Sequence, residues 1–199
     1  GEGLGDGEVG LEVLFLRDLD AEHETTYQVP VTYRGERAPE LEHAFIGTIE
    51  QECTPTDNWG EFYTQQRVLP FAEPAGISTA QRDLVKRACD AIAARSWDVA
   101  PARIHGDLWA GNLLFDAQGG IMIDPAAHGG HRETDLAMLL LFTAPHIARI
   151  IAAYDEAAPL ADGWQERVGL HQLCPVMVHA LVFGGEYVGQ AVRMAESYA

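Results

Sequence analysis

Two acidic residues and an asparagine lie at a spacing that suits one specific chemistry. Asp107 ends the tripeptide His-Gly-Asp, Asn112 follows five positions later, and Asp124 ends the short apolar run 121–123. Phosphoryl transfer uses such a set, because one carboxylate orients the acceptor hydroxyl and takes its proton while an amide oxygen and a second carboxylate hold magnesium on the nucleotide phosphates. A lone His-Gly-Asp would indicate only a polar loop, whereas the joint pattern predicts a kinase.

The elements that position these residues are predicted from apolar runs and turn residues. An apolar lead-in brings Asp107 to the head of a loop, and 113–115 and 121–123 are predicted strands joined by a glycine-containing turn. Such a hairpin places Asn112 and Asp124 near each other at its open end. Two protein oxygens on a rigid hairpin suit magnesium, which keeps its other positions for water or phosphate oxygens.

The chain resembles the fructosamine kinase (ketosamine 3-kinase) family in three motifs: HGDLWAGN (105–112), IDPAAHGGHRETDLAM (123–138) and FGGEYV (183–188). The stretches 44–51 and 58–70 are also similar to segments of that family, so the resemblance runs from about Glu42 to the last residue. It implies a protein-kinase-like fold, shared with aminoglycoside phosphotransferases. It also implies ATP- and Mg²⁺-dependent phosphorylation of a sugar hydroxyl on ketosamines, the adducts of sugars with lysine or small amines. Another small-molecule kinase, of the aminoglycoside or choline type, is the alternative.

Trp109 bears on the choice among these kinases. A tryptophan two positions after the catalytic aspartate resembles the fructosamine kinases, and a broad aromatic face beside the reacting hydroxyl suits the CH faces of a sugar. Trp109 is therefore a candidate for substrate binding. The alternative, that Trp109 only packs the loop, carries equal weight.

Glycines in the segment 126–135 predict a loop that folds back over the site, and this segment resembles part of the family's acceptor pocket. It supplies four further candidates for substrate binding: His128, His131, Arg132 and Glu133. The alternative is local, with Thr134 or Asp135 capping a helix and Arg132 in a surface ion pair, which contributes little. For Asp135, and for His105 beside Asp107, we favour a structural role.

The composition limits which binding partners and which cellular compartment we expect. The net charge of −17 repels nucleic acid and anionic membranes, so we expect neither as a partner. No apolar run approaches the length of a membrane span, and no charged-then-apolar leader is recognisable. The three cysteines are odd in number and far apart, with neither zinc spacing nor a disulfide framework. They predict buried thiols in a reducing compartment, and hence a cytoplasmic protein.

The chain divides into two parts near residue 40. Residues 1–40 hold two β-forming runs, 13–16 and 25–33, whereas residues 41–199 turn mainly helical. Predicted helices run from Asp57 or Asn58 through Val68, from Ser78 or Thr79, over 132–142, from Pro145 to about Ala157, and from about Asp162. Pro175 should end or kink the last helix, and Gly184-Gly185 should break it again. The predicted fold class is α+β, a mainly helical, protein-kinase-like C-terminal lobe carrying a catalytic β-hairpin.

The residues that would bind ATP are less complete in this sequence than those of the acceptor and metal side. A kinase of this type grips ATP with a phosphate-covering loop and a strand lysine that a helix glutamate positions. This chain has one lysine, Lys86, inside a predicted helix, and the glycine-rich stretch 1–7 follows no predicted strand. Arg34 or Arg37 is an unequal substitute for a lysine. We therefore expect the N-terminal nucleotide lobe to be reduced or largely absent, with exposed apolar surface that favours self-association.

Three hypotheses follow for the function. The chain is a working kinase, or a catalytic lobe that binds acceptor and metal with little turnover, or a binding module without catalysis. The third ranks lowest because the Asp107, Asn112 and Asp124 set is intact. The sequence leaves the first two open.

Overall fold

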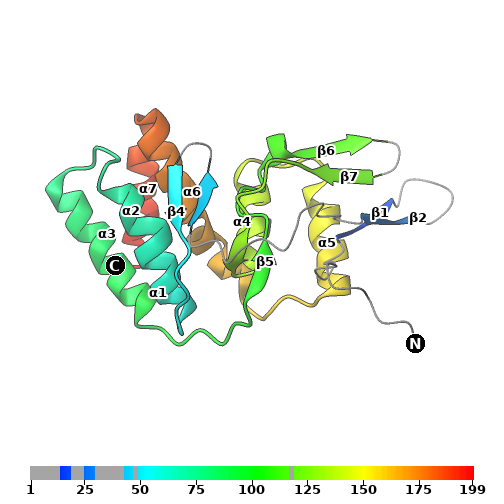
Figure 1. Cartoon of the computed structure of the whole chain (residues 1–199), viewed down its shortest axis with the longest axis horizontal. Helices are drawn as coiled ribbons and strands as arrows, with labels where there is room; N and C mark the ends of the chain where they lie inside the picture. The colour runs from blue at the N-terminus through cyan, green and yellow to red at the C-terminus, as the bar shows by residue number, and fades with distance from the viewer. Residues whose placement is uncertain (1–13, 19–24, 30–42, 47–48, 117–118) are drawn as a thin grey trace.

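The computed structural model describes residues 14–18, 25–29, 43–46, 49–116 and 119–199 (Figure 1). Its strands are β1 (Leu14–Asp18), β2 (Thr25–Val29), β3 (His43–Ile46), β4 (Ile49–Glu52), β5 (Ala102–Ile104), β6 (Leu113–Asp116), β7 (Gly119–Met122) and β8 (His128–Gly130). Its helices are α1 (Trp59–Tyr63), the π-helical η1 (Thr64–Val68), α2 (Leu69–Ala72), α3 (Thr79–Ala93), the 3-10 turn η2 (Ala110–Asn112), α4 (Glu133–Leu141), α5 (Ile147–Ala157), α6 (Trp164–Phe183) and α7 (Glu186–Glu196). The described chain is therefore a mixed helical and stranded protein.

The strands pair two by two rather than in one broad sheet. Consecutive strands form the antiparallel pairs β1–β2, β3–β4 and β6–β7. In the last of these, Leu113 is opposite Met122 and Asp116 is opposite Gly119, which confirms the hairpin predicted around the candidate site. Of the two strands predicted before residue 40, β1 and β2 cover the described parts, and residues 30–33 lie outside the described residues.

The segment that was predicted as a loop over the site is partly a strand. β8 pairs antiparallel with the lead-in strand β5, with Ala102 opposite Gly130 and Ile104 opposite His128. A Cβ at Gly130 would lie 2.8 Å from Cδ1 of Ile104, so the glycine permits this close pairing. The prediction of a loop was wrong at 128–130, because the pairing joins residues that are far apart in sequence.

Side-chain caps start the first helices where the sequence predicts. Oδ1 of Asn58 accepts hydrogen bonds from the N–H groups of Gly60 and Glu61, at 2.7 and 3.3 Å. The helix then passes through the π-helical turn η1 into α2. Ser78 begins α3 with a capping box, in which its hydroxyl accepts from the Gln81 N–H and the Gln81 side chain accepts from the Ser78 N–H.

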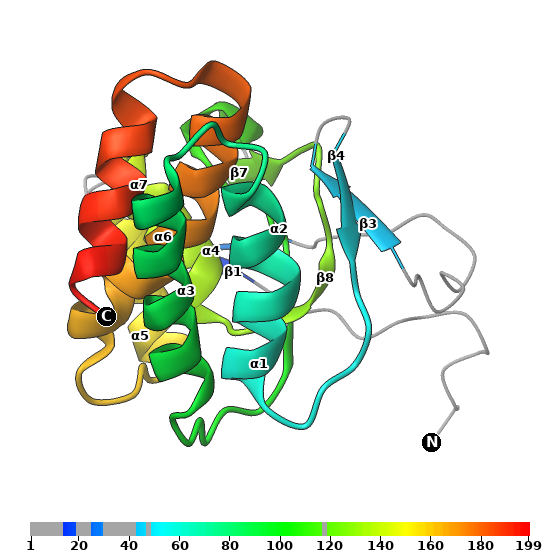
Figure 2. The ribbon, with the colours of Figure 1, turned by 90° about the vertical axis from the view of Figure 1, so that its left-hand side faces the viewer.

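Two apolar cores hold the molecule together. The larger core lies among α1, η1, α2, α3, α6 and α7, which pack side by side in Figure 2, with the β3–β4 pair at the edge of this bundle. Its fully buried side chains include Val68, Val85, Ile92, Leu173 and Met177. The smaller core consists of Leu108, Leu113, Leu139, Ala144 and Ile150. This smaller core joins the loop after β5 and the hairpin strand β6 to α4 and α5. It therefore supports the candidate site.

α6 continues through Pro175, so the proline does not end the helix, which was one of the two outcomes predicted there. Proline lacks an N–H, so the ladder must be broken at this point. The Tyr63 hydroxyl compensates one residue earlier, because it accepts from the Cys174 N–H at 3.0 Å and donates to the Leu170 carbonyl at 2.6 Å. Burial raises the pKa of Tyr63 well above its ordinary value, so the phenol remains neutral. Tertiary contacts therefore maintain a helix that the local sequence disfavours.

The remaining helix boundaries follow the local sequence more closely. α4 and α5 lie within the predicted ranges, although α5 begins two residues after Pro145. Gly184 and Gly185 separate α6 from α7 with φ values of +62° and +58°. A residue with a Cβ is strained at such angles, so the two glycines make the break that the sequence predicts.

The bridging role of Tyr63 leads to a stability prediction. Tyr63→Phe removes only the hydroxyl and leaves one buried and one partly buried backbone group of α6 without that partner, so we expect a loss of about 2 kcal/mol in the free energy of unfolding. Tyr198→Phe is the control, because within the described part of the chain the Tyr198 hydroxyl bridges no helix ladder. Urea unfolding measures both. Equal stability of the Tyr63→Phe variant and the parent protein would contradict this account of Pro175.

Candidate active site

Asp107 and Asn112 contact each other in the loop between β5 and β6. Nδ2 of Asn112 donates to the main-chain oxygen of Asp107 at 2.9 Å and to its carboxylate Oδ2 at 3.2 Å. Asn112 is only 7% exposed, whereas Asp107 is half-buried. Since the amide nitrogen of Asn112 faces Asp107, its amide oxygen faces away from that residue. The structure therefore brings together two of the residues that the spacing singled out.

The hairpin places Asp124 next to this pair. The Ile123 N–H donates to the Asn112 carbonyl at 3.0 Å, one step beyond the Leu113–Met122 pair, and Asp124 follows directly. Asp124 is exposed and has a φ of +52°, in the left-handed region that non-glycine residues rarely adopt. Such strain costs about 1 kcal/mol or more and clusters at functional sites, where the surrounding structure imposes it.

The surroundings of Asp107 favour its protonated form. Burial raises the pKa of the Asp107 carboxyl, while His105, the hydrogen bond from Asn112 and the nearby His179 oppose the shift without cancelling it. A carboxylate with a raised pKa is a better proton acceptor at neutral pH. Asp107 is therefore a half-buried carboxyl group with a raised pKa.

Asp135 holds the loop that carries Asp107. From the first turn of α4, its Oδ2 accepts from the His105 N–H at 2.7 Å and its Oδ1 accepts from the Gly106 N–H at 3.0 Å. The prediction that Thr134 or Asp135 caps α4 was wrong, because Arg132 stands at the cap position without a side-chain cap hydrogen bond. The structural role expected of Asp135 is confirmed, but its carboxylate orders the loop before Asp107 rather than its own helix.

His105 and Gly106 complete this support. Nε2 of His105 lies 2.9 Å from the Ile123 carbonyl, and Nδ1 accepts from the Asp107 N–H at 3.3 Å. A carbonyl only accepts, so Nε2 carries the proton, and burial lowers the pKa of this histidine. Gly106 has a φ of +80°, and a Cβ there would lie 2.3 Å from the Ala126 oxygen. The interpretation of His105 as a residue that locks the loop is confirmed.

Trp109 lies at the surface beside Asp107. Its side chain is 42% exposed and packs edge to face against Phe142, with ring centroids 6.2 Å apart. A Cβ at Gly111 would lie 2.3 Å from the Trp109 ring, so the indole covers the backbone of the loop. Part of the indole is thus used for packing, while a large part of the ring remains exposed.

His128 lies on β8, next to the loop that carries Asp107. Its Nδ1 is 2.8 Å from the Ala126 carbonyl, and its Nε2 accepts from Nε of the buried Arg67 at 3.3 Å. Burial, and then the charge of Arg67, lower the pKa of His128 to about 4. The ring is also tilted against Phe62, at a centroid distance of 5.9 Å. His128 therefore has internal partners on both ring nitrogens.

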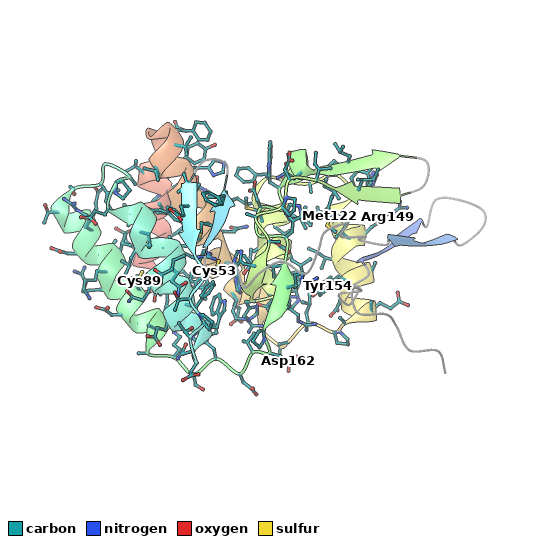
Figure 3. All side chains as sticks on the ribbon, viewed as in Figure 1. Cys53, Cys89, Met122, Arg149, Tyr154 and Asp162 are labelled. Carbon is teal, nitrogen blue, oxygen red and sulfur yellow. The ribbon has the colours of Figure 1, made fainter. Side chains whose placement is uncertain are left out.

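Arg132 and Glu133 also engage internal partners. Arg132 donates to the Ala158 carbonyl at 3.1 Å and to the Pro159 carbonyl, and its guanidinium lies 5.8 Å from the ring centre of Tyr154, which is labelled in Figure 3. Glu133 is 2% exposed and accepts two hydrogen bonds from Arg167, at 2.6 and 2.8 Å. Burial raises the pKa of Glu133, but the contacts with Arg167 and His171 outweigh it and bring the pKa to about 2. Both side chains tie the start of α4 to its neighbours.

His131 belongs to the same buried cluster. Potential ligand atoms of His131, Glu133 and His171 lie within 4.8 Å of one another, as in a metal site. However, the Arg167 guanidinium occupies both Glu133 oxygens, and a cation beside it would be repelled. Burial lowers the pKa of His131 to about 4 and also lowers that of His171, so both rings are neutral. The cluster therefore consists of one ion pair, Arg167 with Glu133, and two neutral histidines at the junction of α4 and α6.

The other residues that the sequence singled out lie away from Asp107 or outside the described residues. Lys86 is on α3 in an exposed ion pair with Asp90, at 2.8 Å. The stretch 1–7, Arg34 and Arg37 lie outside the described residues. Cys53, Cys89 and Cys174 are free thiols, and Figure 3 shows the first two apart, with Cys53 just after β4 and Cys89 on α3. Among the described residues, no helix combines the length and apolar character required to cross a membrane.

Comparison with known proteins decides the family. The sequence profile described as Fructosamine kinase matches residues 41–199. The chain belongs to the fructosamine kinase family. A second profile, described as Maltokinase N-terminal cap domain, matches residues 3–57 and overlaps the start of the first.

Individual relatives agree with this membership. The chain is 30% identical over 163 residues to a "probable ketoamine kinase" of Enterococcus faecium (77% of this chain, 58% of the relative). It is 32% identical over 144 residues to the ketosamine-3-kinase of Mus musculus (69% of this chain, 46% of the relative). The crystal structure of a "putative fructosamine-3-kinase" from Thermobifida fusca superposes with a TM-score of 0.73 at 45% identity, over 78% of this chain and 56% of that one. The chain spans about half the length of these relatives.

The buried Glu133–Arg167 pair leads to a second stability prediction. Arg167→Ala leaves a buried carboxylate without its fork of donors, so we expect the free energy of unfolding to fall by about 3 kcal/mol. Lys86→Ala is the control, because it breaks an ion pair whose side chains are 64% and 58% exposed, and we expect a change within about 0.5 kcal/mol. Thermal unfolding at neutral pH compares the two variants. Equal losses would show that the cluster does not stabilise the α4–α6 junction.

Proposed function

We propose that this chain carries the acceptor and metal side of an ATP- and Mg²⁺-dependent kinase that phosphorylates a sugar hydroxyl of ketosamines. The observation that carries the proposal is the contact of Asn112 with Asp107 beside the strained, exposed Asp124, in a member of the fructosamine kinase family. The relatives named ketoamine and ketosamine kinases support the acceptor class. Because the chain spans about half their length, its own activity is part of the proposal.

Asn112 and Asp124 are the proposed magnesium ligands. The Asn112 amide turns its nitrogen to Asp107 and its oxygen away, and the Asp124 carboxylate is exposed at the open end of the hairpin. Both offer hard oxygen atoms, which fit a magnesium ion that also takes waters and phosphate oxygens. When bound, this ion would neutralise charge on the transferred phosphoryl group.

Asp107 is the proposed catalytic base. It orients the sugar hydroxyl for in-line attack and takes the hydroxyl proton late in the reaction, a role that its raised pKa supports. Trp109 offers its exposed indole face to the sugar ring. The protein has little covalent work to do, so the rate depends mainly on position and charge.

The four residues after Asp124 take an indirect role in this proposal. The internal partners of His128, His131, Arg132 and Glu133 suggest that they hold β8 and the start of α4 in place. They would then shape the acceptor side indirectly, because β8 and α4 lie next to the loop that carries Asp107. Trp109 remains the proposed direct contact with the substrate.

Residues 41–199 would form the protein-kinase-like catalytic lobe, and residues 1–40 a reduced β-rich segment on the nucleotide side. The start of the Fructosamine kinase match at residue 41 and the β1–β2 pair support this division. A cytoplasmic location and self-association through exposed apolar surface belong to the same proposal. The pairing of the single lysine with Asp90 on α3 favours a second candidate, an acceptor-binding lobe with little turnover.

Asp107→Asn tests the proposed function. We expect magnesium-dependent ATP consumption with fructosyl-lysine, reduced by roughly 10²- to 10⁴-fold in the variant, because it loses the base and keeps the shape of the side chain. Asp90→Asn makes the same chemical change on exposed α3, and we expect parental activity. Unchanged activity in Asp107→Asn would contradict the proposed base. Absent turnover in a folded protein that still binds fructosyl-lysine would favour the acceptor-binding lobe.

A further inference from the structure

Aromatic rings extend from Trp109 in a continuous series. Phe142 lies 6.2 Å from Trp109 and 4.9 Å from His179 between ring centroids. His179 in turn lies 5.5 Å from Phe183 and 5.1 Å from Tyr187, and these two rings are 6.1 Å apart. We call the four rings beyond Trp109 the aromatic arc: Phe142, His179, Phe183 and Tyr187.

The arc is assembled from three elements. Phe142 follows the last residue of α4, His179 and Phe183 lie on the last turns of α6, and Tyr187 lies on the first turn of α7. Gly184 and Gly185 turn the chain between the two helices, and a Cβ at either position would meet no atom within 4 Å. The arc therefore borders open space at the α6–α7 turn.

The arc is more exposed than a structural cluster requires. Phe183 is 67% exposed, and Trp109, at the start of the series, is 42% exposed. Exposed large apolar side chains that lie together mark binding surfaces more often than single ones do. Phe142, His179 and Tyr187 are partly exposed, so a ligand at the α6–α7 turn would reach parts of these rings as well.

His179 connects the arc to the catalytic carboxylate. Its Nδ1 lies 2.7 Å from the Pro175 carbonyl, which only accepts, so Nδ1 donates this hydrogen bond and the ring is fixed. Nε2 is then the ring nitrogen left for a ligand. The charge of His179 is also close enough to lower the pKa of Asp107. The series therefore begins at Trp109 and passes close to Asp107, where the proposed function places the sugar hydroxyl.

We propose that the aromatic arc binds the amine end of the acceptor and selects ketosamines whose amine substituent is apolar or aromatic. This inference rests on the proposed function, which places the sugar at Asp107 and Trp109. The nitrogen of a ketosamine is a secondary ammonium, and aromatic faces attract such cations. A net charge of −17 also favours a cationic ligand. An acidic substituent would meet no positive side chain among the four rings.

Calorimetric titration without nucleotide tests the arc separately from turnover. The two probes are the fructosyl adducts of benzylamine and of glycine, which share the sugar and differ in the amine substituent. We expect the protein to bind the benzylamine adduct more tightly. We expect Phe183→Ala and Tyr187→Ala each to reduce the preference roughly 3- to 10-fold, as the loss of one aromatic contact implies. Phe45→Ala, which removes a 56% exposed phenyl group from β3, is the matched control and should keep the preference.

The possible outcomes test ligand selection by the aromatic arc separately from kinase activity. A preference that is reduced in both arc variants and kept in Phe45→Ala supports the arc, whether or not phosphate is transferred. Equal binding of the two adducts by the parent protein, or an unchanged preference in both arc variants, overturns it even if transfer depends on Asp107. Binding of neither adduct also overturns it.

Discussion

Two hydrogen bonds from backbone N–H groups to the Asp135 carboxylate are the constraint on which the candidate site depends. They join the loop that carries Asp107 to the first turn of α4, across a wide gap in the sequence. Hydrogen bonds to a charged acceptor are stronger than those between neutral groups, and they leave the loop few alternative conformations. Gly106, with its positive φ, allows the backbone to turn its N–H group toward this carboxylate. Asp107 thus gains a defined position without being buried completely.

The rest of the fold fixes Asp135 itself. Arg167 and Glu133 connect the start of α4 to α6, and Tyr63 connects α6 to α1 through the broken ladder before Pro175. On the other side, Leu108 and Leu113 pack with Leu139 and Ile150, so the loop and the hairpin rest on α4 and α5. The main-chain bond from Ile123 to Asn112 then carries the position of the loop to Asp124. A rigid helical base therefore supports three small polar side chains.

Local signals in the sequence were sufficient for some of this architecture and insufficient for the rest. Asn58 and Ser78 begin helices because their side chains bond nearby N–H groups, and the hairpin follows from two apolar runs around a turn, so both could be predicted. Three other features depend on partners that are distant in sequence. These are the hydrogen bonds of Asp135 to the loop, the burial of Glu133 against Arg167, and the continuity of α6 through Pro175. No short pattern encodes such partners. The contact between Asp107 and Asn112 was not predicted, because the spacing indicated only a loop followed by a hairpin. The roles of both residues in catalysis remain a prediction.

Amide hydrogen exchange in Asp135→Asn tests most directly whether this carboxylate orders the catalytic loop. If it does, the His105 and Gly106 amides should exchange at least about tenfold faster than in the parent protein, since one weakened or lost hydrogen bond corresponds to about 1.4 kcal/mol. Amides in the middle of α3 and α6 should keep their parental rates, because the two cores do not involve Asp135. Unchanged exchange at both loop amides, in a folded variant, would contradict the account.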